Sequence, residues 1–427
     1  MKDAGQYMYN LAKKLFPICR SITGNGFRQS LNIIRDEIPE IQVVEVPSGT
    51  TFFDWTVPNE WNIKEGYIET LQGEKIIDFN NSNLHVLGYS LPVDKVITRE
   101  ELLNHVYTIP EQPDWIPYVT SYYKERWGFC MSEKQKEKLC CKQYHVRIDS
   151  SLTQGGLTYG ELVIPGESKE EIMFTSYLCH PSMANNELSG PVVLTELIKY
   201  LKSLSYRRYT YRFLFNPETI GSIVYLAKNL EELKQNVKAG FVVSCVGDER
   251  AYSYIQSKYA NTLADLVTQN VLKFHAPNYN TYSFLKRGSD ERQFCSSGID
   301  LPFCGICRSK YMEYPEYHTS ADNMELITPK GLAESLDLLI KIINALEYNF
   351  KYQVNCKCEP QLGKRGLYPT VSRKGAYDAV IAIKDFIAYA DGKNNLVEIS
   401  NIINQPIDTL IPIIKDLKEK ELIVHIA

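Results

Sequence analysis

Short apolar runs alternate with segments of helical periodicity between about residues 142 and 350. The strand-like runs are GELVIPG, EIMFTSYL, YRFLFN and GFVVSCV, and the helical segments are residues 190–204, 222–236, 261–274 and 329–348. Runs of this length predict buried strands, and apolar residues three and four apart predict amphipathic helices. The alternation predicts an α/β domain with a mixed, mostly parallel sheet covered by helices on both faces.

The last of these helices has the clearest boundary signals. Thr328 is a suitable N-cap, and Pro329 suits the first helical position. One apolar stripe follows, made of Leu332, Leu336, Leu339, Ile343 and Leu346. We expect this stripe to face the core of the domain.

The first 46 residues predict two helices and a strand. Apolar residues recur at helical spacing at Tyr7, Leu11 and Leu15 and again at Phe27, Leu31 and Ile34. The β-branched run Ile41–Val46 then predicts a strand. We assign this segment to the same domain as the alternating region.

The segment from 47 to 130 differs in amino-acid composition from the segments around it. It is rich in Pro, Trp, Tyr and Asn and contains short strand-like pieces such as HVLGYSLPV. Strand character resumes at Tyr144–Ile148. We therefore predict a β-rich domain at 47–130, inserted into a main domain that comprises residues 1–46 and 131–350.

The carboxyl-terminal part predicts a winged helix. After a polar connector at 350–370, helices are expected at 374–390, 395–403 and 406–420, and a strand at Leu422–Ile426. Three helices followed by a strand outline a winged helix, assigned to 357–427. Its ten Lys and Arg against nine Asp and Glu provide no basic cluster, so nucleic-acid binding is not expected. Packing against the main domain or a second copy of the chain is favoured instead.

Composition narrows the class of protein. Apolar residues make up 44% and charged residues 23% of the chain, with a net charge of −4. The amino-terminal segment mixes charges into its apolar positions, and no uncharged apolar run reaches the length of a membrane span. Eleven cysteines, an odd and scattered set, fit reduced thiols better than a disulfide framework. We expect a cytoplasmic protein without membrane contact.

Four polar segments follow strands or precede helices. They place His180 after EIMFTSYLC, Glu218 after YRFLFNP, Asp248 after GFVVSCVG and His318 in EYPEYHTSADN. Because the carboxyl ends of parallel strands meet at one edge of a sheet, these side chains are expected to converge. Two histidines and two carboxylates are a ligand set that zinc accepts, with one carboxylate left as a base.

These segments carry a family resemblance. The run VIPGESKEEIMFTSYLCH…ANNELSG…PETIGS…VGD…YHTSADN resembles the co-catalytic zinc aminopeptidases, a superfamily that includes glutaminyl cyclases and the metal-free transferrin-receptor ectodomain. More narrowly, the whole chain is similar to bacterial aminopeptidase-like proteins that carry a β-rich insertion and a winged helix and are often encoded near surface-polysaccharide genes. The resemblance implies metal-dependent hydrolysis of a peptide or small amide.

The resemblance also implies roles for individual residues. His180, Asp248 and His318 match metal ligands, and Glu218 matches the general base that takes a proton from water. Asp290, in RGSDERQF, and Tyr317 are further candidates for substrate contact, with a turn cap and a packed aromatic as the alternatives.

Two positions depart from the family pattern. Asn186 stands where the superfamily has an aspartate that bridges two zinc ions, and Thr219 stands where a ligand of the second zinc is expected. A neutral amide does not offset the charge of a close metal pair, so one zinc ion is expected rather than two. Glu187 is an alternative ligand, with a helix-start carboxylate as the plainer interpretation.

Two other functions stay open at this stage. One is a non-catalytic binding or regulatory protein on a degenerate peptidase fold, which the two replaced ligands favour and which the retained Glu218 and both histidines oppose. The other is a small-molecule amidase linked to surface-polysaccharide metabolism. A homo-oligomer is compatible with either.

Overall fold

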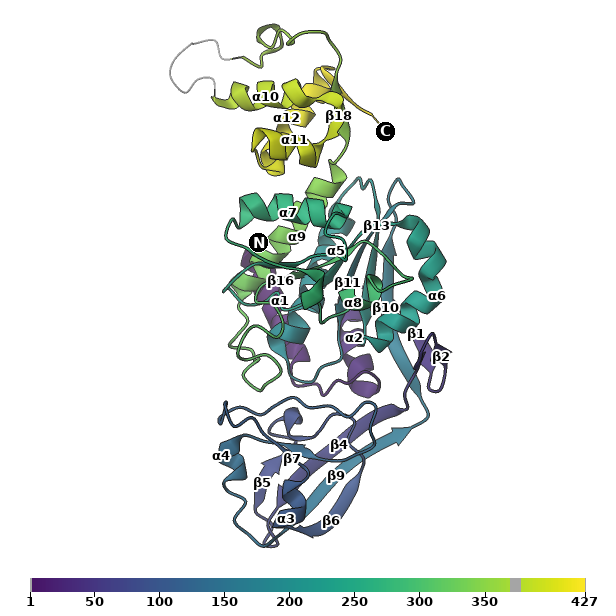
Figure 1. Cartoon of the computed structure of the whole chain (residues 1–427), viewed down its shortest axis with the longest axis vertical. Coiled ribbons are helices and arrows are strands. Elements are labelled where there is room, and N and C mark those ends of the chain that lie inside the picture. Colours follow the sequence, from purple (N-terminus) through teal and green to yellow (C-terminus); the bar gives the residue numbers. More distant parts are fainter. Residues whose placement is uncertain (1, 369–377, 427) are drawn as a thin grey trace. The chain divides into compact units, whose positions relative to one another are not determined.

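The computed structural model describes residues 2–368 and 378–426. Its contacts divide the chain into two compact units. The first comprises Met1–Ala260 and Asn280–Leu336, and the second Asn261–Tyr279 and Asp337–Ala427. Figure 1 shows the elements of the chain, coloured along the sequence. Within the described ranges, no helix has both the length and the apolar character needed to cross a membrane.

The first unit is built on an eight-stranded mixed sheet with the order β1-β10-β12-β11-β13-β16-β14-β15. The strands are β1 (Gln42–Pro47), β10 (Gly156–Ile164), β12 (Thr210–Asn216), β11 (Glu171–Tyr177), β13 (Val237–Val243), β16 (Phe303–Cys307), β14 (Ser253–Ile255) and β15 (Asn280–Tyr282). The central strands β12, β11, β13 and β16 are parallel. β1 pairs antiparallel with β10, β10 with β12 and β14 with β16, whereas β14 and the edge strand β15 are parallel. The predicted mixed, mostly parallel sheet is confirmed.

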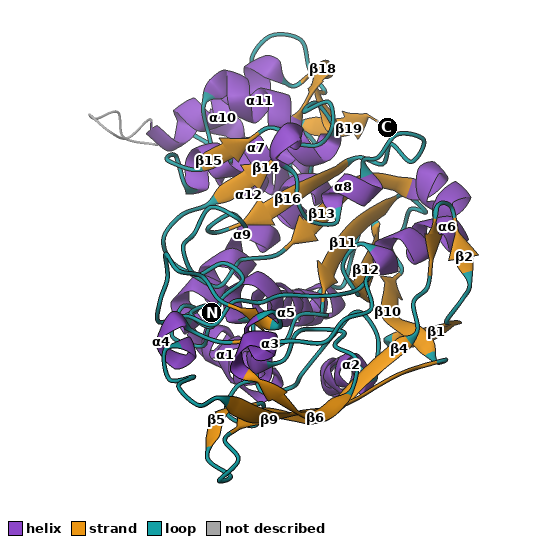
Figure 2. Ribbon diagram, turned by 60° about the horizontal axis from the view of Figure 1, so that its bottom comes forward, coloured by secondary structure: helices purple, strands orange, loops and turns teal. Residues whose placement is uncertain are grey.

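Helices cover both faces of this sheet (Figure 2). α5 (Ser189–Ser203) connects β11 to β12, and α6 (Ile220–Asn236) connects β12 to β13 in the opposite direction along the sheet. Because such crossovers are right-handed, opposite directions place α5 and α6 on opposite faces. α1 (Lys2–Leu15) and α2 (Asn25–Glu37) pack against α5, and α8 (Glu291–Phe294) packs against α6.

The expected start of the helix after residue 328 is confirmed. α9 spans Pro329–Glu347, and Oγ1 of Thr328 accepts a hydrogen bond from the backbone N–H of Gly331 at 2.9 Å. The predicted apolar stripe is buried, with Leu332, Ile343 and Leu346 fully inaccessible to solvent.

The insertion forms its own four-stranded antiparallel sheet with the order β5-β4-β9-β6. The strands are β4 (Glu60–Glu69), β5 (Lys75–Asp78), β6 (Val93–Thr98) and β9 (Gln143–Thr153). Smaller elements surround it: β2 (Thr51–Phe52), β3 (Trp55–Thr56), β7 (Val106–Tyr107), β8 (Phe129–Cys130), α3 (Arg99–Leu103), α4 (Glu133–Lys136) and the 3₁₀ turn Asn83–His85.

Strand β9 lies beyond the predicted domain boundary at residue 130. It occupies the middle of the inserted sheet, and its inward side chains Tyr144, Val146 and Ile148 belong to the core of the insertion. By strand pairing, the insertion therefore extends to Thr153, further than the sequence pattern indicated. The pattern could not reveal this, because an alternating strand has the same appearance in either domain.

The second unit contains the winged helix. The helices of the winged helix are α10 (Asp378–Tyr389), α11 (Leu396–Ile403) and α12 (Ile407–Glu419), and its sheet has the order β18 (Asp391–Asn395), β17 (Lys351–Val354) and β19 (Ile423–Ile426). The second unit also includes α7 (Leu263–His275) and the part of α9 from Asp337 onwards. The winged helix is confirmed, and β17 shows that it begins within the predicted connector. Residues 374–377 of the first expected helix lie outside the described residues.

Candidate metal and catalytic site

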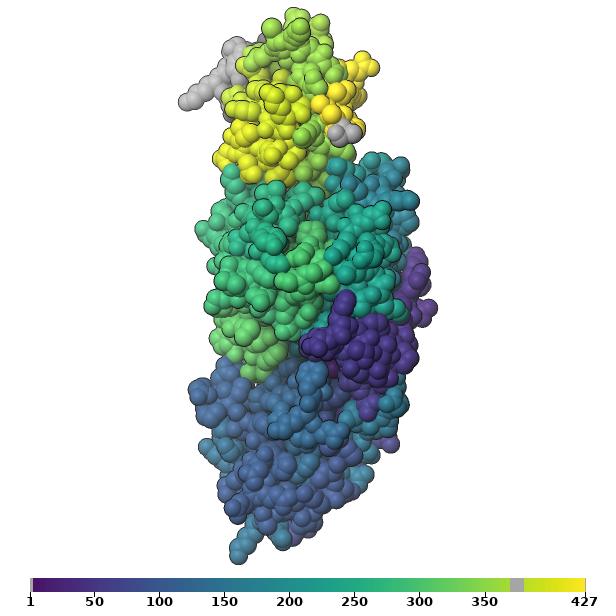
Figure 3. Space-filling view, turned by 45° about the vertical axis from the view of Figure 1, so that its right-hand side comes forward, coloured from purple at the N-terminus to yellow at the C-terminus, as the bar shows by residue number. Residues whose placement is uncertain are grey.

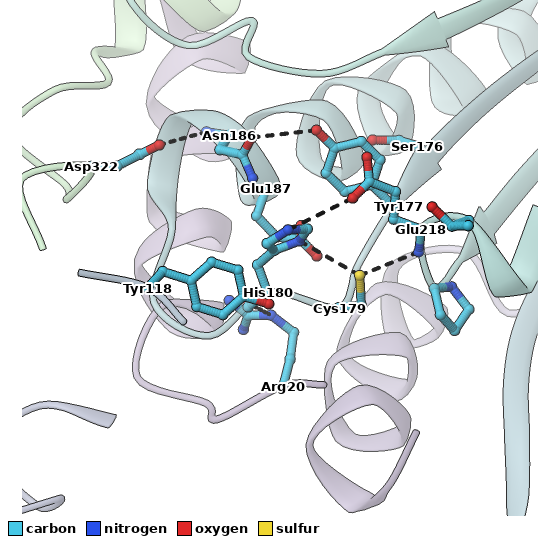
Figure 4. Close-up of polar contacts among 12 residues, drawn as sticks. Arg20, Tyr118, Ser176, Tyr177, Cys179, His180, Asn186, Glu187, Glu218 and Asp322 are labelled. Carbon is cyan, nitrogen blue, oxygen red and sulfur yellow. Dashed lines mark hydrogen bonds and ion pairs between the residues drawn. The ribbon is translucent and has the colours of Figure 1, made fainter. Parts of the chain in front are cut away.

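His180 follows β11 and is held by a buried carboxylate. Its Nδ1 lies 2.6 Å from Oε2 of Glu187, and the two residues are 5% and 0% exposed (Figure 4). An ionised carboxylate can only accept, so the imidazole donates from Nδ1 and keeps the lone pair on Nε2. Burial opposes protonation of His180, but the charge of Glu187 and this hydrogen bond outweigh it and raise the pKa of the imidazole.

Glu187 lies in a π-helical turn, Ala184–Leu188, directly before α5. Asp322 fixes the turn: its carboxylate accepts the backbone N–H groups of Asn185 at 2.5 Å and Asn186 at 2.9 Å. Burial raises the pKa of Asp322 to about 6. Gly190 allows the turn to approach the sheet, because a Cβ there would stand 2.3 Å from the carbonyl oxygen of Val243.

Glu218 reaches the same place from the end of β12. Its Oε2 lies 3.8 Å from Nε2 of His180, and its backbone N–H donates to Sγ of Cys179 at 3.2 Å. Burial raises the pKa of Glu218 to about 7. The next residue, Thr219, has a φ of +66°, a strained conformation for a β-branched residue, as is common beside functional sites.

His318 completes a pair of imidazoles. Its ring centroid lies 5.3 Å from that of His180, and Tyr317 stacks on it at 3.9 Å between ring centroids. The buried Nε2 of His318 has no hydrogen-bond partner. Burial first, and then the charge of His180, lower the pKa of His318 well below its ordinary value. His318 also has a left-handed backbone, with φ +55°.

The insertion contributes directly to this site. The ring centroid of Tyr118 lies 5.0 Å from those of both His180 and His318, and its backbone N–H donates to the carbonyl oxygen of His318 at 2.8 Å. Two further bonds join Ile116 to Ser320. In the space-filling view, the blue surface of the insertion meets the green surface of the loops that follow β16 (Figure 3).

In the structure the carboxylate of Asp248 is engaged in hydrogen bonds and is not free to act beside His180. Its oxygens accept hydrogen bonds from Nδ2 of Asn185 at 3.0 Å, from Oγ and the backbone N–H of Ser309 at 2.9 and 3.0 Å, and from the backbone N–H of Arg250 at 2.9 Å. Asp248 thus ties three segments together. Its predicted role as a metal ligand would require some of these bonds to be given up, and stays a prediction.

Two other predicted site residues also have structural partners. Asp290 is fully buried, and accepts from the backbone N–H of Thr219 at 2.8 Å and from Nδ2 of Asn216 at 3.0 Å. It therefore holds the loop that carries Glu218. Oδ1 of Asn186 lies 3.8 Å from Sγ of Cys245 and 3.5 Å from the Tyr177 hydroxyl.

The donor set can be tested against one metal ion. Buried atoms without a partner gather at this site: Nε2 of His318, Oε1 of Glu187 and Nδ2 of Asn186. Two imidazoles beside carboxylates are a set that zinc accepts, and the contact from Glu187 to Nδ1 of His180 has the form that commonly orients a histidine ligand. The residues therefore fit one cation. A second cation fits poorly, because Asn186 is neutral and the hydroxyl of Thr219 accepts a hydrogen bond from the guanidinium of Arg292.

One compact group points to a different ligand set. In the part of the chain that the structure describes, Cys179, His180 and Glu187 have ligand atoms within 4.8 Å of one another. Burial raises the pKa of the Cys179 thiol well above its ordinary value, which disfavours the thiolate that binds metal. Nδ1 of His180 is engaged by Glu187. We therefore favour a metal ion bound at Nε2 of His180 over one bound by Cys179, His180 and Glu187 together.

Sequence reasoning missed three residues of this site. Arg20 is buried and donates from Nε to the carbonyl oxygen of His180 at 2.9 Å, Tyr118 contacts both histidines, and Arg292 bonds to Thr219. The cluster of aromatic residues in WIPYVTSYY was a usable signal for Tyr118. No local pattern distinguishes the two arginines from surface ones.

A cavity of about 820 Å³ opens near the loops that carry the two histidines. Its lining includes Ser182 and Ser320, each two residues beyond a site histidine, together with aromatic side chains such as Trp61 and Phe79. Most of its polar lining consists of amides and hydroxyls, and Lys64 is the one charged residue among the lining residues that the structure describes.

Comparison with known proteins identifies relatives over nearly the whole chain. Residues 9–349 match the model of a domain of unknown function, DUF4910, and residues 350–425 match a winged helix-turn-helix. A Clostridium acetobutylicum protein, named for polysaccharide biosynthesis and an aminopeptidase-like domain, is 48% identical over 93% of this chain and 91% of its own length.

Solved structures give the same picture. The crystal structure of a protein described as a peptidase from Clostridium acetobutylicum covers 100% of this chain and 97% of its own, with 45% identity and a TM-score of 0.93. A zinc aminopeptidase from Bacillus subtilis shares the fold at 12% identity and a TM-score of 0.58, over 80% of this chain and 94% of its own. The chain therefore belongs to the DUF4910 family, with an aminopeptidase-like fold and a winged helix at its carboxyl end.

Proposed function

We propose that the chain is a metal-dependent amide hydrolase of the aminopeptidase type, with one zinc ion. The observation that carries the proposal is the pair formed by the buried His180 and the half-buried His318 beside Glu218: their imidazole centroids are 5.3 Å apart, and Nε2 of His180 is 3.8 Å from Oε2 of Glu218. These two histidines would hold the ion. A bound zinc ion supplies polarisation of an amide carbonyl and acidification of water.

The protein's own residues would then carry the proton transfers. The Glu218 carboxylate accepts a proton from the attacking water, a C–O bond forms, and the same proton passes to the leaving nitrogen as the C–N bond breaks. Glu187 keeps His180 in one tautomer, and Tyr118 and Tyr317 restrict the two rings by contact on their faces. The products are an amine and a carboxylic acid, which releases its proton to water and leaves as the carboxylate.

Metal analysis and an amide-hydrolysis assay test this proposal together. We expect about one equivalent of zinc per chain and hydrolysis of an acyl anilide that Glu218→Gln lowers by about 100-fold or more, within the range for general-base residues. Glu231→Gln, an exposed substitution on α6, is the matched control and should leave the rate unchanged. A chain without zinc whose hydrolysis is unaffected by Glu218→Gln would instead support the non-catalytic alternative.

The name of the Clostridium relative, which mentions polysaccharide biosynthesis, favours a second candidate substrate class, the amide of an amino sugar. The amides, hydroxyls and aromatic rings of the cavity are suited to a polyhydroxylated ligand, although His180, Glu218 and His318 do not line it. Rates on N-acylated amino sugars and on aminoacyl anilides, measured at equal concentration, would decide between the two classes. Faster hydrolysis of the anilides would exclude the sugar amide as the preferred substrate class.

A further inference from the structure

Within the described part of the chain, Arg292 makes no close ion pair at the candidate site, although its charge opposes the raised pKa of the nearby Glu218 and Asp290 carboxyls. Its Nη2 donates to Oγ1 of Thr219, the residue that follows Glu218, and its buried Nε has no partner. Among the residues that the structure describes, no carboxylate oxygen lies within 4.0 Å of its guanidinium. Among the other arginines of the first unit, some have such partners, namely Arg28, Arg147, Arg212, Arg250 and Arg308. Others donate to carbonyl or hydroxyl oxygens instead, namely Arg20, Arg99, Arg126 and Arg207.

Arg292 faces the reacting region from α8. Burial raises the pKa values of Glu218 and of Tyr317, and the charge of Arg292 opposes both shifts, so its guanidinium is near both side chains. It acts in the same way on the pKa of Tyr123 of the insertion, a residue that is 69% exposed. Because its Nη2 donates to Thr219, which directly follows Glu218, Arg292 lies beside the loop that carries the base.

Leaving a guanidinium donor buried and unpaired is unfavourable, and an incoming anion removes that cost. The planar fork of arginine matches a carboxylate in two parallel hydrogen bonds, and one guanidinium balances its single charge. A substrate ammonium would be repelled at this place. Asp290 cannot easily bind one, because its oxygens already accept from Thr219 and Asn216.

We propose that Arg292 selects amides whose acyl part bears a carboxylate, rather than amides of an ordinary α-amino acid with a free ammonium. The inference rests on the proposed hydrolase function and specifies its substrate class. Arg292 is a specificity-determining residue in this account, since it contacts the carboxylate and takes no part in proton transfer.

Three p-nitroanilides of similar size test the inference with the full-length chain and zinc: succinyl (anionic), butyryl (neutral) and alanyl (cationic). The wild type is expected to favour succinyl, chiefly through a lower KM. Arg292→Gln should lower kcat/KM for succinyl by about 10- to 100-fold and for butyryl by a smaller factor. Arg292→Lys retains the charge but not the planar fork, so its kcat/KM for succinyl should fall between those of the wild type and Arg292→Gln.

The control is Arg287→Gln, an exposed arginine five residues earlier, which should leave all three values unchanged. An equal loss on all three anilides in Arg292→Gln would assign Arg292 a structural role and overturn the inference. So would a wild type that prefers alanyl, although the hydrolase function would then stand.

Calorimetric titration with succinate separates the two proposals if no anilide is hydrolysed. Binding that Arg292→Gln weakens by about tenfold or more would support anion recognition while the hydrolase proposal fails. Absence of binding to the wild type would overturn the inference as well.

Discussion

Nδ1 of His180 lies 2.6 Å from Oε2 of Glu187, a fully buried carboxylate seven residues later in the chain. The sequence places a neutral Asn186 where the resembling enzymes have an aspartate, with the carboxylate one position further along. In the structure that carboxylate contacts Nδ1 of the histidine ring, where it would orient His180 as the proposed ligand rather than bridge two ions.

Replacing Glu187 with Gln is expected to weaken zinc binding by about 10- to 100-fold, because the imidazole loses the charged acceptor that fixes its tautomer. The change preserves side-chain size, so the fold should persist. Zinc affinity can be measured by competition with a chromogenic chelator. Glu196→Gln, on α5 and paired with Lys199, is the control. Equal zinc affinities in the wild type and Glu187→Gln would mean that Glu187 does not contribute to metal binding.

The variant Asn186→Asp is expected to bind one zinc ion per chain, as the wild type does. Although it restores the superfamily's carboxylate, a second ion would lie towards Thr219, whose hydroxyl is engaged by the cationic Arg292. Elemental analysis after dialysis against zinc gives the stoichiometry. Two equivalents in this variant would show that the single substitution alone had prevented the second site.

The fold was largely predictable because its signals are local. Buried runs such as EIMFTSY appear as strands β10 to β13, and helical periodicity and the Thr328 cap give α5, α6 and α9. The boundary of the insertion was harder to predict, since β9 pairs with residues of β4 that are 76 to 93 positions away and with residues of β6 that are 45 to 55 positions away. The sequence of one strand does not identify the strand with which it pairs.

The site was predictable only in part, for a similar reason. His180, Glu218 and His318 follow strand ends or precede helices, and the geometry of the sheet brings them together. Asp248 follows a strand as well, yet the side chains of Asn185 and Ser309 satisfy its carboxylate. Tyr118 comes from the insertion, and only the tertiary structure places it on the histidines.

Tyr118→Ala should lower kcat/KM by about tenfold, because the ring that restricts both imidazoles is removed and small displacements of catalytic groups are costly. Tyr118→Phe keeps the ring and loses only the bond to the Tyr122 hydroxyl, so its effect should be smaller. Tyr206→Ala, at an exposed tyrosine, controls for loss of an aromatic side chain. Equal losses in the Ala and Phe variants would assign the role to the hydroxyl.

A pH-dependent contribution to stability is expected where α2 meets the insertion. Arg28 makes two hydrogen bonds to the Glu60 carboxylate, at 2.9 and 2.5 Å, and Glu60 also accepts the backbone N–H of Gly156 at 3.1 Å. The bonds from Arg28, opposed by burial, lower the pKa of Glu60 to about 2. An unfolded glutamate titrates near 4.3.

Since the folded pKa is the lower one, the contribution of Glu60 is fully present above about pH 5 and is lost as the pH falls towards 2. Glu60→Gln should therefore reduce the free energy of unfolding by about 1–2 kcal/mol at pH 7, with the difference shrinking between pH 5 and 3. Urea unfolding at several pH values measures it. Glu74→Gln, at an exposed turn of the insertion, should show a small offset at every pH. A Glu60→Gln difference that stayed constant down to pH 3 would mean that side-chain packing, and not the ion pair with Arg28, links α2 to β4.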